Sequence, residues 1–153
     1  MKILIRNLQR HRPLNKAKIT RTALHILSLS DLSGQAGTEL SILFVGDRKM
    51  KQLNTAYRGI RKSTDVLSFE AQIPLQKGMD NNILGDIVIN VPRAESQAGA
   101  YGTGFYDEIC RLLVHGTLHL LGYDHEKSEY RARKMRKKEQ EIMDAVKKMD
   151  RKR

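Results

Sequence analysis

The spacing of apolar residues along the chain predicts short strands that alternate with amphipathic helices. Residues 2–5 are apolar apart from Lys2 and predict a first strand. After Pro13, four apolar residues recur at helical spacing, which predicts a helix with one buried face. These four residues are Ile19, Ala23, Ile26 and Leu27. In residues 39–45 apolar and other side chains alternate, which is typical of a strand.

A second helix is expected directly after that strand. Gly46 and Asp47 predict a turn and an N-cap, because a short acidic side chain can accept hydrogen bonds from the first free amides of a helix. Met50, Leu53 and Tyr57 follow at helical spacing and are expected to form the packing face of this helix.

Two further strands are predicted in the middle of the chain, at residues 66–69 and 86–90. The glycine-rich residues 33–37 predict a turn, and a longer loop with Pro74 and Gly78 is expected between the two strands.

Three helices are expected in the remainder of the chain. One begins near Pro92, which suits a first helical turn, and ends near Gly102. The most apolar helix spans residues 105–121, with Gly122 placed for a left-handed C-terminal cap. A final basic helix is expected at about 126–150. Its packing stripe would consist of Met135, Ile142, Val146 and Met149.

The order of these elements predicts the fold class. Most strands precede the longest helices, and a helix connects two of the strands. We therefore predict an α+β fold, with a small mixed β-sheet packed against several helices. No repeat or low-complexity linker divides the chain, so residues 1–153 are expected to form a single metallohydrolase domain.

The charge of the chain indicates a polyanionic partner. Its 28 Lys and Arg residues outnumber 17 Asp and Glu residues, which gives a net charge of +11. Such a field attracts nucleic acid by long-range steering and by counterion release. Residues 126–153 hold 12 of the basic residues and 6 of the acidic ones. This tail is equally compatible with a solvated face and with a surface that follows phosphates.

The N-terminal and cysteine patterns predict a cytoplasmic protein that does not enter a membrane. The first residues offer only three consecutive apolar side chains, too few for the core of a signal peptide. No segment approaches the length of a membrane span. The chain has a single cysteine, Cys110, which rules out an internal disulfide and fits a reducing compartment.

Three of the five histidines lie in the segment HGTLHLLGYDH, residues 115–125. On a helix, His115 and His119 are about 40° apart around the axis and about 6 Å apart along it, so they can bind one ion together. Gly122 ends the helix and allows His125 to approach as a third ligand. Three imidazoles with an open fourth position are typical of a catalytic zinc site. Cys110 would lie on another face of the helix.

The histidine spacing matches that of the metzincin proteases, with one difference. Those enzymes carry a glutamate directly after the first histidine as the general base, and this chain has Gly116 there. A bound metal can still lower the pKa of water toward ~7. We expect Gly116 to leave space beside the metal for a bulky charged group, which favours a phosphodiester substrate over a peptide.

Three segments of the chain carry a resemblance to a known family. HGTLHLLGYDHE (115–126), NTAYRGIRKSTDVLSF (54–69) and LGDIVIN (84–90) closely resemble the signature of the YbeY family of bacterial metal-dependent endoribonucleases. The resemblance implies a zinc-dependent endoribonuclease of single-strand type that acts in ribosomal RNA maturation and ribosome quality control. It also implies RNA, chiefly ribosomal RNA, and the small ribosomal subunit as partners.

The resemblance further implies roles for individual residues. His115, His119 and His125 would bind one metal ion, zinc or another divalent metal. Arg58 would line the active site, where a guanidinium can hold a phosphate bidentately; Arg58 and His115 are therefore the expected catalytic residues. Supporting roles are expected for Asp124, Asp65 and Ser68: Asp124 would orient a histidine or stabilise the turn, while Asp65 and Ser68 would order the loop and strand edge.

Two other functions remain open at this point. One is a zinc peptidase or amidase that takes its base from elsewhere, such as Glu108 on the helix of the histidines. The other is a non-catalytic ribosome-binding factor whose metal only holds its last two helices together.

Overall fold

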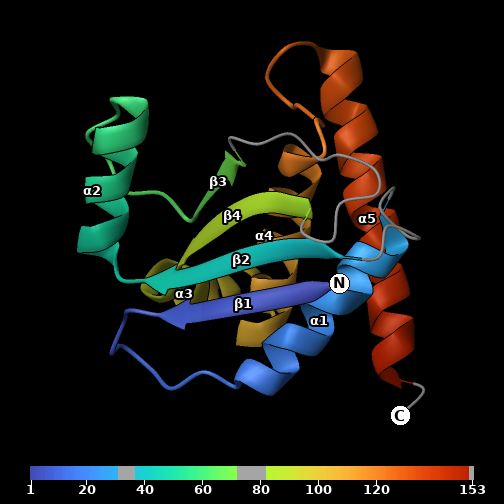
Figure 1. Cartoon of the computed structure of the whole chain (residues 1–153), viewed down its shortest axis with the longest axis horizontal. Coiled ribbons are helices and arrows are strands. Elements are labelled where there is room, and N and C mark those ends of the chain that lie inside the picture. Colours follow the sequence, from blue (N-terminus) through green and yellow to red (C-terminus); the bar gives the residue numbers. More distant parts are fainter. Residues whose placement is uncertain (31–36, 72–81, 152–153) are drawn as a thin grey trace.

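The computed structural model describes residues 1–30, 37–71 and 82–151. Strands and helices follow one another in the expected order (Figure 1). The elements are β1 (Lys2–Asn7), α1 (Lys16–Leu29), β2 (Thr38–Val45), α2 (Asp47–Arg58), β3 (Val66–Glu70), β4 (Asn82–Asn90), α3 (Val91–Tyr101), α4 (Phe105–Leu120) and α5 (Glu129–Arg151).

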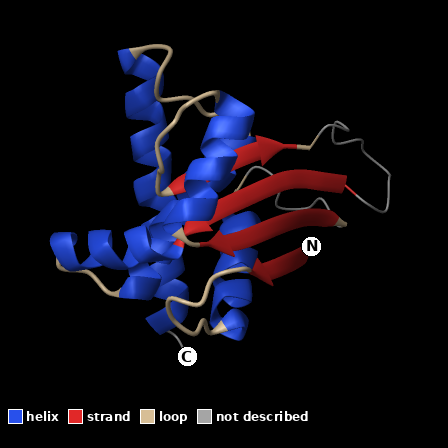
Figure 2. Ribbon diagram, turned by 90° about the vertical axis from the view of Figure 1, so that its left-hand side faces the viewer, coloured by secondary structure: helices blue, strands red, loops and turns tan. Residues whose placement is uncertain are grey.

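The four strands form one mixed sheet in the order β1-β2-β4-β3. β1, β2 and β4 run parallel, whereas β3 pairs antiparallel with β4 and lies at an edge of the sheet. In Figure 2 most of the helical mass lies to one side of the strands. The predicted α+β fold with a small mixed sheet is thus confirmed. No helix in the described ranges is long and apolar enough to cross a membrane.

The two faces of the sheet carry separate apolar clusters, because successive strand residues point to opposite sides. Ile87 and Ile89 of β4 belong to the main core, which α1, α4 and α5 complete. Val88, between them, belongs to a smaller cluster with Met50 of α2. The predicted apolar face of α1 is entirely buried, as are Met135, Ile142 and Val146 of α5.

Helix α4 lies within the core and carries the first two histidines. Most of its apolar side chains are buried, so contacts on several sides fix the position and rotation of the helix. It ends at Leu120, and Gly122, two residues further on, has a φ of 94° in the left-handed region. The Gly122 amide donates to the carbonyl of His119 and the Tyr123 amide to that of Leu118, both at 3.0 Å. These two bonds form a Schellman motif, as expected from the glycine.

Several sequence-based expectations differ from the structure in detail. Asp47 is the first residue of α2 and not its N-cap, because Gly46 has the extended conformation of the cap position. Tyr57 is 70% exposed and packs edge-on against Phe69, since α2 contacts the sheet mainly through Met50.

Other differences concern the ends of elements. β4 begins at residue 82 and not at 86, and α5 begins at 129, where Ser128 Oγ accepts the amide of Arg131 at 3.0 Å. Residues 33–36 of the expected turn, and the expected loop with Pro74 and Gly78, lie outside the described residues.

Candidate metal centre and cleft

The three predicted histidines lie together at the end of α4. Their ligand-capable nitrogens are all within 4.8 Å of one another. The Nε2 atoms of His115 and His119 are 3.0 Å apart, and the ring of His125 lies 5.0 Å from that of His119, between centroids. Three converging imidazoles are a suitable donor set for one borderline-soft divalent ion. These residues therefore fit the predicted metal.

The Schellman motif at Gly122 brings His125 to the other two histidines. It reverses the chain directly after α4, so that the following turn passes back over His119. Asp124 stabilises this turn, because its carboxylate accepts the amide of Glu126 at 2.7 Å. That bond, together with nearby cations, lowers the pKa of Asp124. In the structure, Asp124 forms no hydrogen bond with a histidine ring of the described chain.

The protonation of His119 suits metal binding. Burial lowers the pKa of His119, and the neighbouring His115 and His125 lower it further. His119 is therefore neutral at neutral pH, which is the form that binds a metal. The Nδ1 atom of His115 forms a short hydrogen bond with Oε1 of Glu139 in α5. This bond directs Nε2 of the same ring toward His119.

Glu139 is a functional candidate that the sequence reasoning missed. A carboxylate that accepts the Nδ1–H of a ligating histidine fixes the orientation of the ring and increases its basicity. Glu139 lies four residues after Met135 and three before Ile142, on the buried stripe of α5. An acidic residue inside an apolar stripe is the signal that could have indicated this role.

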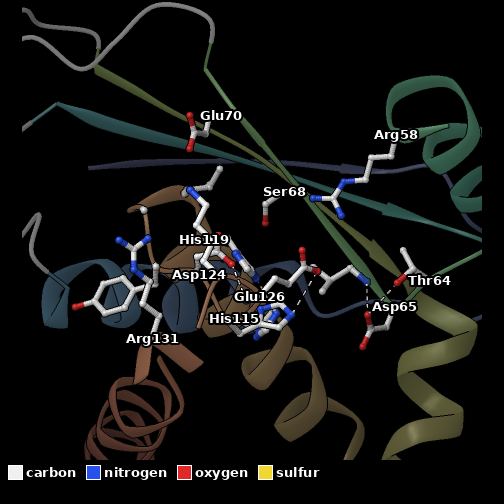
Figure 3. A pocket seen from close by; sticks show the side chains of 16 residues that line it. Arg58, Thr64, Asp65, Ser68, Glu70, His115, His119, Asp124, Glu126 and Arg131 are labelled. Carbon is white, nitrogen blue, oxygen red and sulfur yellow. Dashed lines mark hydrogen bonds and ion pairs between the residues drawn. The ribbon is translucent and has the colours of Figure 1, made fainter. Parts of the chain in front are cut away.

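The histidines open into a cleft of about 660 Å³ between β3, the end of α4 and the start of α5. Figure 3 shows Arg58 on one side of His115 and His119, and Arg131 on the other. Arg58, Asp65, Ser68 and Asp124 all line this cleft, as do the three histidines. The structure thus brings every residue of the predicted site to one cavity.

Arg58 reaches the cleft because it is the last residue of α2. Gly59 follows in the left-handed conformation, with φ of 69°, and ends the helix there. The loop after Gly59 is held by Asn90, whose buried amide donates to Asp47 Oδ1 at 2.9 Å and to the carbonyl of Thr64 at 3.1 Å. Asn90 is a second residue that the sequence reasoning missed.

Asp65 and Ser68 bond to the protein around the cleft and not to the histidines. Ser68 donates from Oγ to the carbonyl of Gly116 at 3.1 Å, which ties β3 to α4. Asp65 accepts the amide of Val66 at 2.8 Å and the side chain of Gln97 at 3.3 Å. Both contacts order the loop and the strand edge.

The expectation of open space at Gly116 is wrong. A Cβ atom built on Gly116 would lie 3.0 Å from Cγ2 and 3.1 Å from Cδ1 of Ile87, and 3.1 Å from Oγ of Ser68. Gly116 is therefore required for close packing of α4 on the sheet. The position that carries the general base in metzincins is occupied here by the side chains of β3 and β4.

Glu108, the alternative base, is also in a different setting from the one expected. It is buried, and Arg111 donates to both of its oxygens, at 2.6 and 2.8 Å. A carboxylate held in this way is not available to accept a proton in the cleft. Cys110 lines another cavity, beside α5, and burial raises the pKa of its thiol to about 12.

Fold and site together define an α+β protein in which three histidines that could hold a metal ion lie in an open, charged cleft. Comparisons with known proteins assign this class to a family. Residues 4–147 match the family model described as Endoribonuclease YbeY. The chain belongs to the YbeY family, as its motifs indicated.

Relatives from several bacteria support this assignment. The chain is 51% identical to an endoribonuclease YbeY of Thermodesulfovibrio yellowstonii over 71% of this chain and 67% of the relative. It is 43% identical to that of Pelotomaculum thermopropionicum over 94% of this chain and 95% of the relative. The solution structure of TM1509 from Thermotoga maritima has the same fold, with a TM-score of 0.63 and 24% identity over 98% of this chain and 92% of that chain.

Proposed function

We propose that this protein is a zinc-dependent endoribonuclease that acts in the maturation of ribosomal RNA and in ribosome quality control. The observation that carries the proposal is the convergence of three imidazoles and Arg58 on one cleft in a chain whose relatives are endoribonucleases. Its substrate would be ribosomal RNA and its partner the small ribosomal subunit, in the cytoplasm. The net charge of +11 supports a polyanionic substrate.

The donor set supports zinc as the metal. His115, His119 and His125 would hold the ion, and three protein ligands leave a coordination position open, as catalytic zinc sites do. When bound, the ion supplies Lewis acidity and charge neutralisation at the scissile phosphate. Glu139 would keep His115 in the required tautomer, and burial keeps His119 neutral.

Arg58 would supply the second positive group of the reaction. Its guanidinium forms no ion pair with a carboxylate of the described chain, so its donors are available to a phosphate. A bidentate contact from Arg58 would orient the phosphodiester and stabilise the negative charge that grows on its oxygens during attack.

Gly116 offers no carboxylate base and Glu108 is held by Arg111, so two nucleophiles are to be compared, water and a hydroxyl of the substrate. An RNA substrate carries its own nucleophile, the 2′-hydroxyl next to the scissile phosphate. Internal attack by this group leaves a 2′,3′-cyclic phosphate and a 5′-hydroxyl, whereas attack by water with the 3′-oxygen as leaving group leaves a 5′-phosphate and a 3′-hydroxyl. Product-end analysis distinguishes the two routes.

The proposal is tested by cleavage of an end-labelled fragment of small-subunit ribosomal RNA. Wild type, His115→Ala and Arg58→Ala are purified identically, together with Arg61→Ala as a control for the loss of an exposed arginine in the same loop. We expect wild type and Arg61→Ala to cut, the other two to be inactive, and zinc to restore chelator-treated wild type. Equal cutting in all four samples would indicate a contaminant and reject the proposal.

Two outcomes would support the other functions. Hydrolysis of a peptide library that requires His119 would indicate a peptidase or amidase. Metal-independent RNA binding without any cleavage, with Arg58→Ala intact in cells, would indicate a ribosome-binding factor.

A further inference from the structure

The cleft carries a cationic group at each of its two ends. Arg58, from the end of α2, lies on one side of the histidines, and Arg131, from the first turn of α5, lies on the other (Figure 3). Lys127, in the turn before α5, also lines the cleft. The family resemblance and the zinc chemistry account for Arg58 but leave Arg131 and Lys127 without a role.

Neither of these two side chains is held in a close ion pair by the described chain, although the charge of Lys127 acts on Asp124. Among the described residues, no carboxylate forms an ion pair with Lys127 or Arg131. Arg111 shows the contrast, because it is held by Glu108 at 2.6 Å and lies 3.8 Å from Asp65. Both Lys127 and Arg131 are exposed and can bind an external anion without breaking an internal contact.

The remaining charges of the cleft make its ends the favourable positions for phosphates. Carboxylates also line the cleft, and they would repel a phosphate placed beside them. These are Asp65, Glu70, Asp124 and Glu126. A polyanion therefore has to be held by particular cations and not by a uniform positive field. Arg58 at one end and Arg131 at the other are two of those cations, and Lys127, four residues before Arg131 in the turn that leads into α5, is the third.

The geometry of α5 separates Arg131 from the other basic residues of the same helix. At 100° per residue, Arg133 lies about 160° and Lys137 about 120° around the helix axis from Arg131. Both are exposed, and neither lines the cleft. The charge of the tail is thus divided: Arg131 and Lys127 face the cleft, whereas Arg133 and Lys137 face solvent elsewhere.

We propose that Lys127 and Arg131 form a second phosphate-binding subsite, so that one RNA strand crosses the three-histidine centre with its backbone held at both ends. The inference rests on the proposed function and specifies how that substrate lies. A cleft of about 660 Å³ is in the range of sites for small ligands, which suits a few nucleotides of a single strand. The scissile phosphate lies between the two anchors, beside the histidines.

The test is binding of a single-stranded 2′-O-methyl RNA of roughly 12 nucleotides, a length within the footprint of single-strand binding sites. The zinc-loaded protein is titrated by fluorescence anisotropy at several salt concentrations, and a gel verifies that the strand stays intact. Lys127→Gln with Arg131→Gln is compared with wild type and with Arg133→Gln plus Lys137→Gln. The two double variants lose the same charge, and melting curves show that both are folded.

For single strands each phosphate contact contributes roughly 0.7 to the slope of log K against log salt. We expect the Lys127/Arg131 variant to lose about 1.4 from this slope and to bind about 15-fold more weakly at ~0.15 M salt. The Arg133/Lys137 variant should retain a slope and affinity close to those of wild type.

Three results would overturn the inference. Equal weakening of both double variants would mean that α5 acts only through its general charge, and unchanged binding of the Lys127/Arg131 variant would mean that the subsite does not exist. In either case RNA binding by wild type would leave the proposed function standing. If wild type itself did not bind the strand, the proposed function would fail together with the inference.

Discussion

Glu139 is the residue whose role depends most on the fold. It lies on α5, twenty-four positions after His115, and contacts that histidine only because α5 packs beside α4. The bond leaves Nε2 of His115 directed at the centre of the three rings. A single carboxylate on one helix thus sets the geometry of a ligand on another.

Replacement of Glu139 should therefore weaken metal binding without unfolding the protein. Loss of the carboxylate that orients a ligating histidine typically costs about 10- to 100-fold in metal affinity. We expect Glu139→Ala to lose affinity in this range and Glu139→Gln to lose less, since an amide oxygen can still accept the Nδ1–H. Competition with a chelating dye measures the affinity for zinc.

Glu141→Ala is the matched control, because Glu141 is exposed on the same helix. Equal zinc affinities of the Glu139 and Glu141 variants would show that the contact with His115 has no effect on the metal.

Two glycines in helices should respond to alanine in opposite directions. Alanine at Gly99 of α3 meets no atom within 4 Å, so it should stabilise the protein by about 0.5–1 kcal/mol through its helix propensity. Alanine at Gly116 would press against the buried Ile87. It should lower the free energy of unfolding of the protein by about 1–3 kcal/mol, as overpacking does. Urea denaturation gives both values. A stabilised Gly116→Ala would show that α4 can move away from the sheet.

At the scale of elements, the loop after α2 is important because Arg58 lies directly before it. The contacts that hold this loop therefore also hold Arg58. Asn90 connects this loop with its surroundings: it caps α3 by accepting the amide of Arg93 at 3.2 Å and donates to Asp47, Ser63 and Thr64. One buried amide therefore joins α2, the loop and α3. The position of Arg58 depends on this junction.

Asn90→Ala should be more destabilising than the loss of an ordinary helix cap. Removal of a cap costs about 0.5–2 kcal/mol, and the buried groups that lose their partner add about 1–3 kcal/mol. Asn15, which caps α1 at an exposed position, provides the comparison, because among the described residues its side chain bonds the amide of Lys18 alone. Chemical denaturation of Asn90→Ala and Asn15→Ala should give clearly different losses; equal losses would mean that Asn90 acts as a cap alone.

The same junction predicts a pH effect. A hydrogen bond from Ser63, and then one from Asn90, lowers the pKa of Asp47 from its ordinary 3.8. Because the folded pKa is below the unfolded one, the ionised carboxylate stabilises the fold above pH 3.8, and this contribution disappears as the pH falls through the folded pKa. Wild type should therefore lose more unfolding free energy than Asp47→Asn between about pH 5 and about pH 2.

This difference is measured by urea unfolding of metal-free protein across that pH range. Asp144→Asn, at an exposed position of α5, controls for the loss of a surface charge. Parallel curves for wild type and Asp47→Asn would contradict the stabilising role of the ionised carboxylate.

At the scale of the whole molecule, the core does not depend on the metal centre. The main cluster joins α1, α4 and α5 to the sheet through aliphatic side chains, and Met135, Ile142 and Val146 attach α5 without any histidine. A metal that only held the last two helices together would therefore add to an interface that is already apolar. This arrangement favours a functional role for the ion.

Removal of zinc should leave the protein folded. A ligand at hundredfold excess over its Kd stabilises by about 2.7 kcal/mol, which for this chain length corresponds to a fall in Tm of about 5–11 °C on removal. We expect metal-free protein to keep its far-UV circular dichroism and to unfold cooperatively. Loss of helical signal on chelation, reversed by zinc, would instead indicate a structural metal.

The sequence by itself determined the elements and the donor set. Periodic apolar residues predicted the helices and strands with errors of a few residues at their ends, and the spacing of His115, His119, Gly122 and His125 predicted one metal site. The three motifs identified the family correctly. These features are local: a helical turn, a strand and a glycine-terminated helix follow from neighbouring residues.

Only the tertiary structure decided how distant segments meet. It placed Glu139 on His115, filled the space at Gly116 with the sheet, and turned Arg131 but not Arg133 toward the cleft. None of these follows from spacing along the chain, because each depends on which helix face packs against which strand. That choice is made by burial of the whole apolar core, to which residues from both ends of the chain contribute.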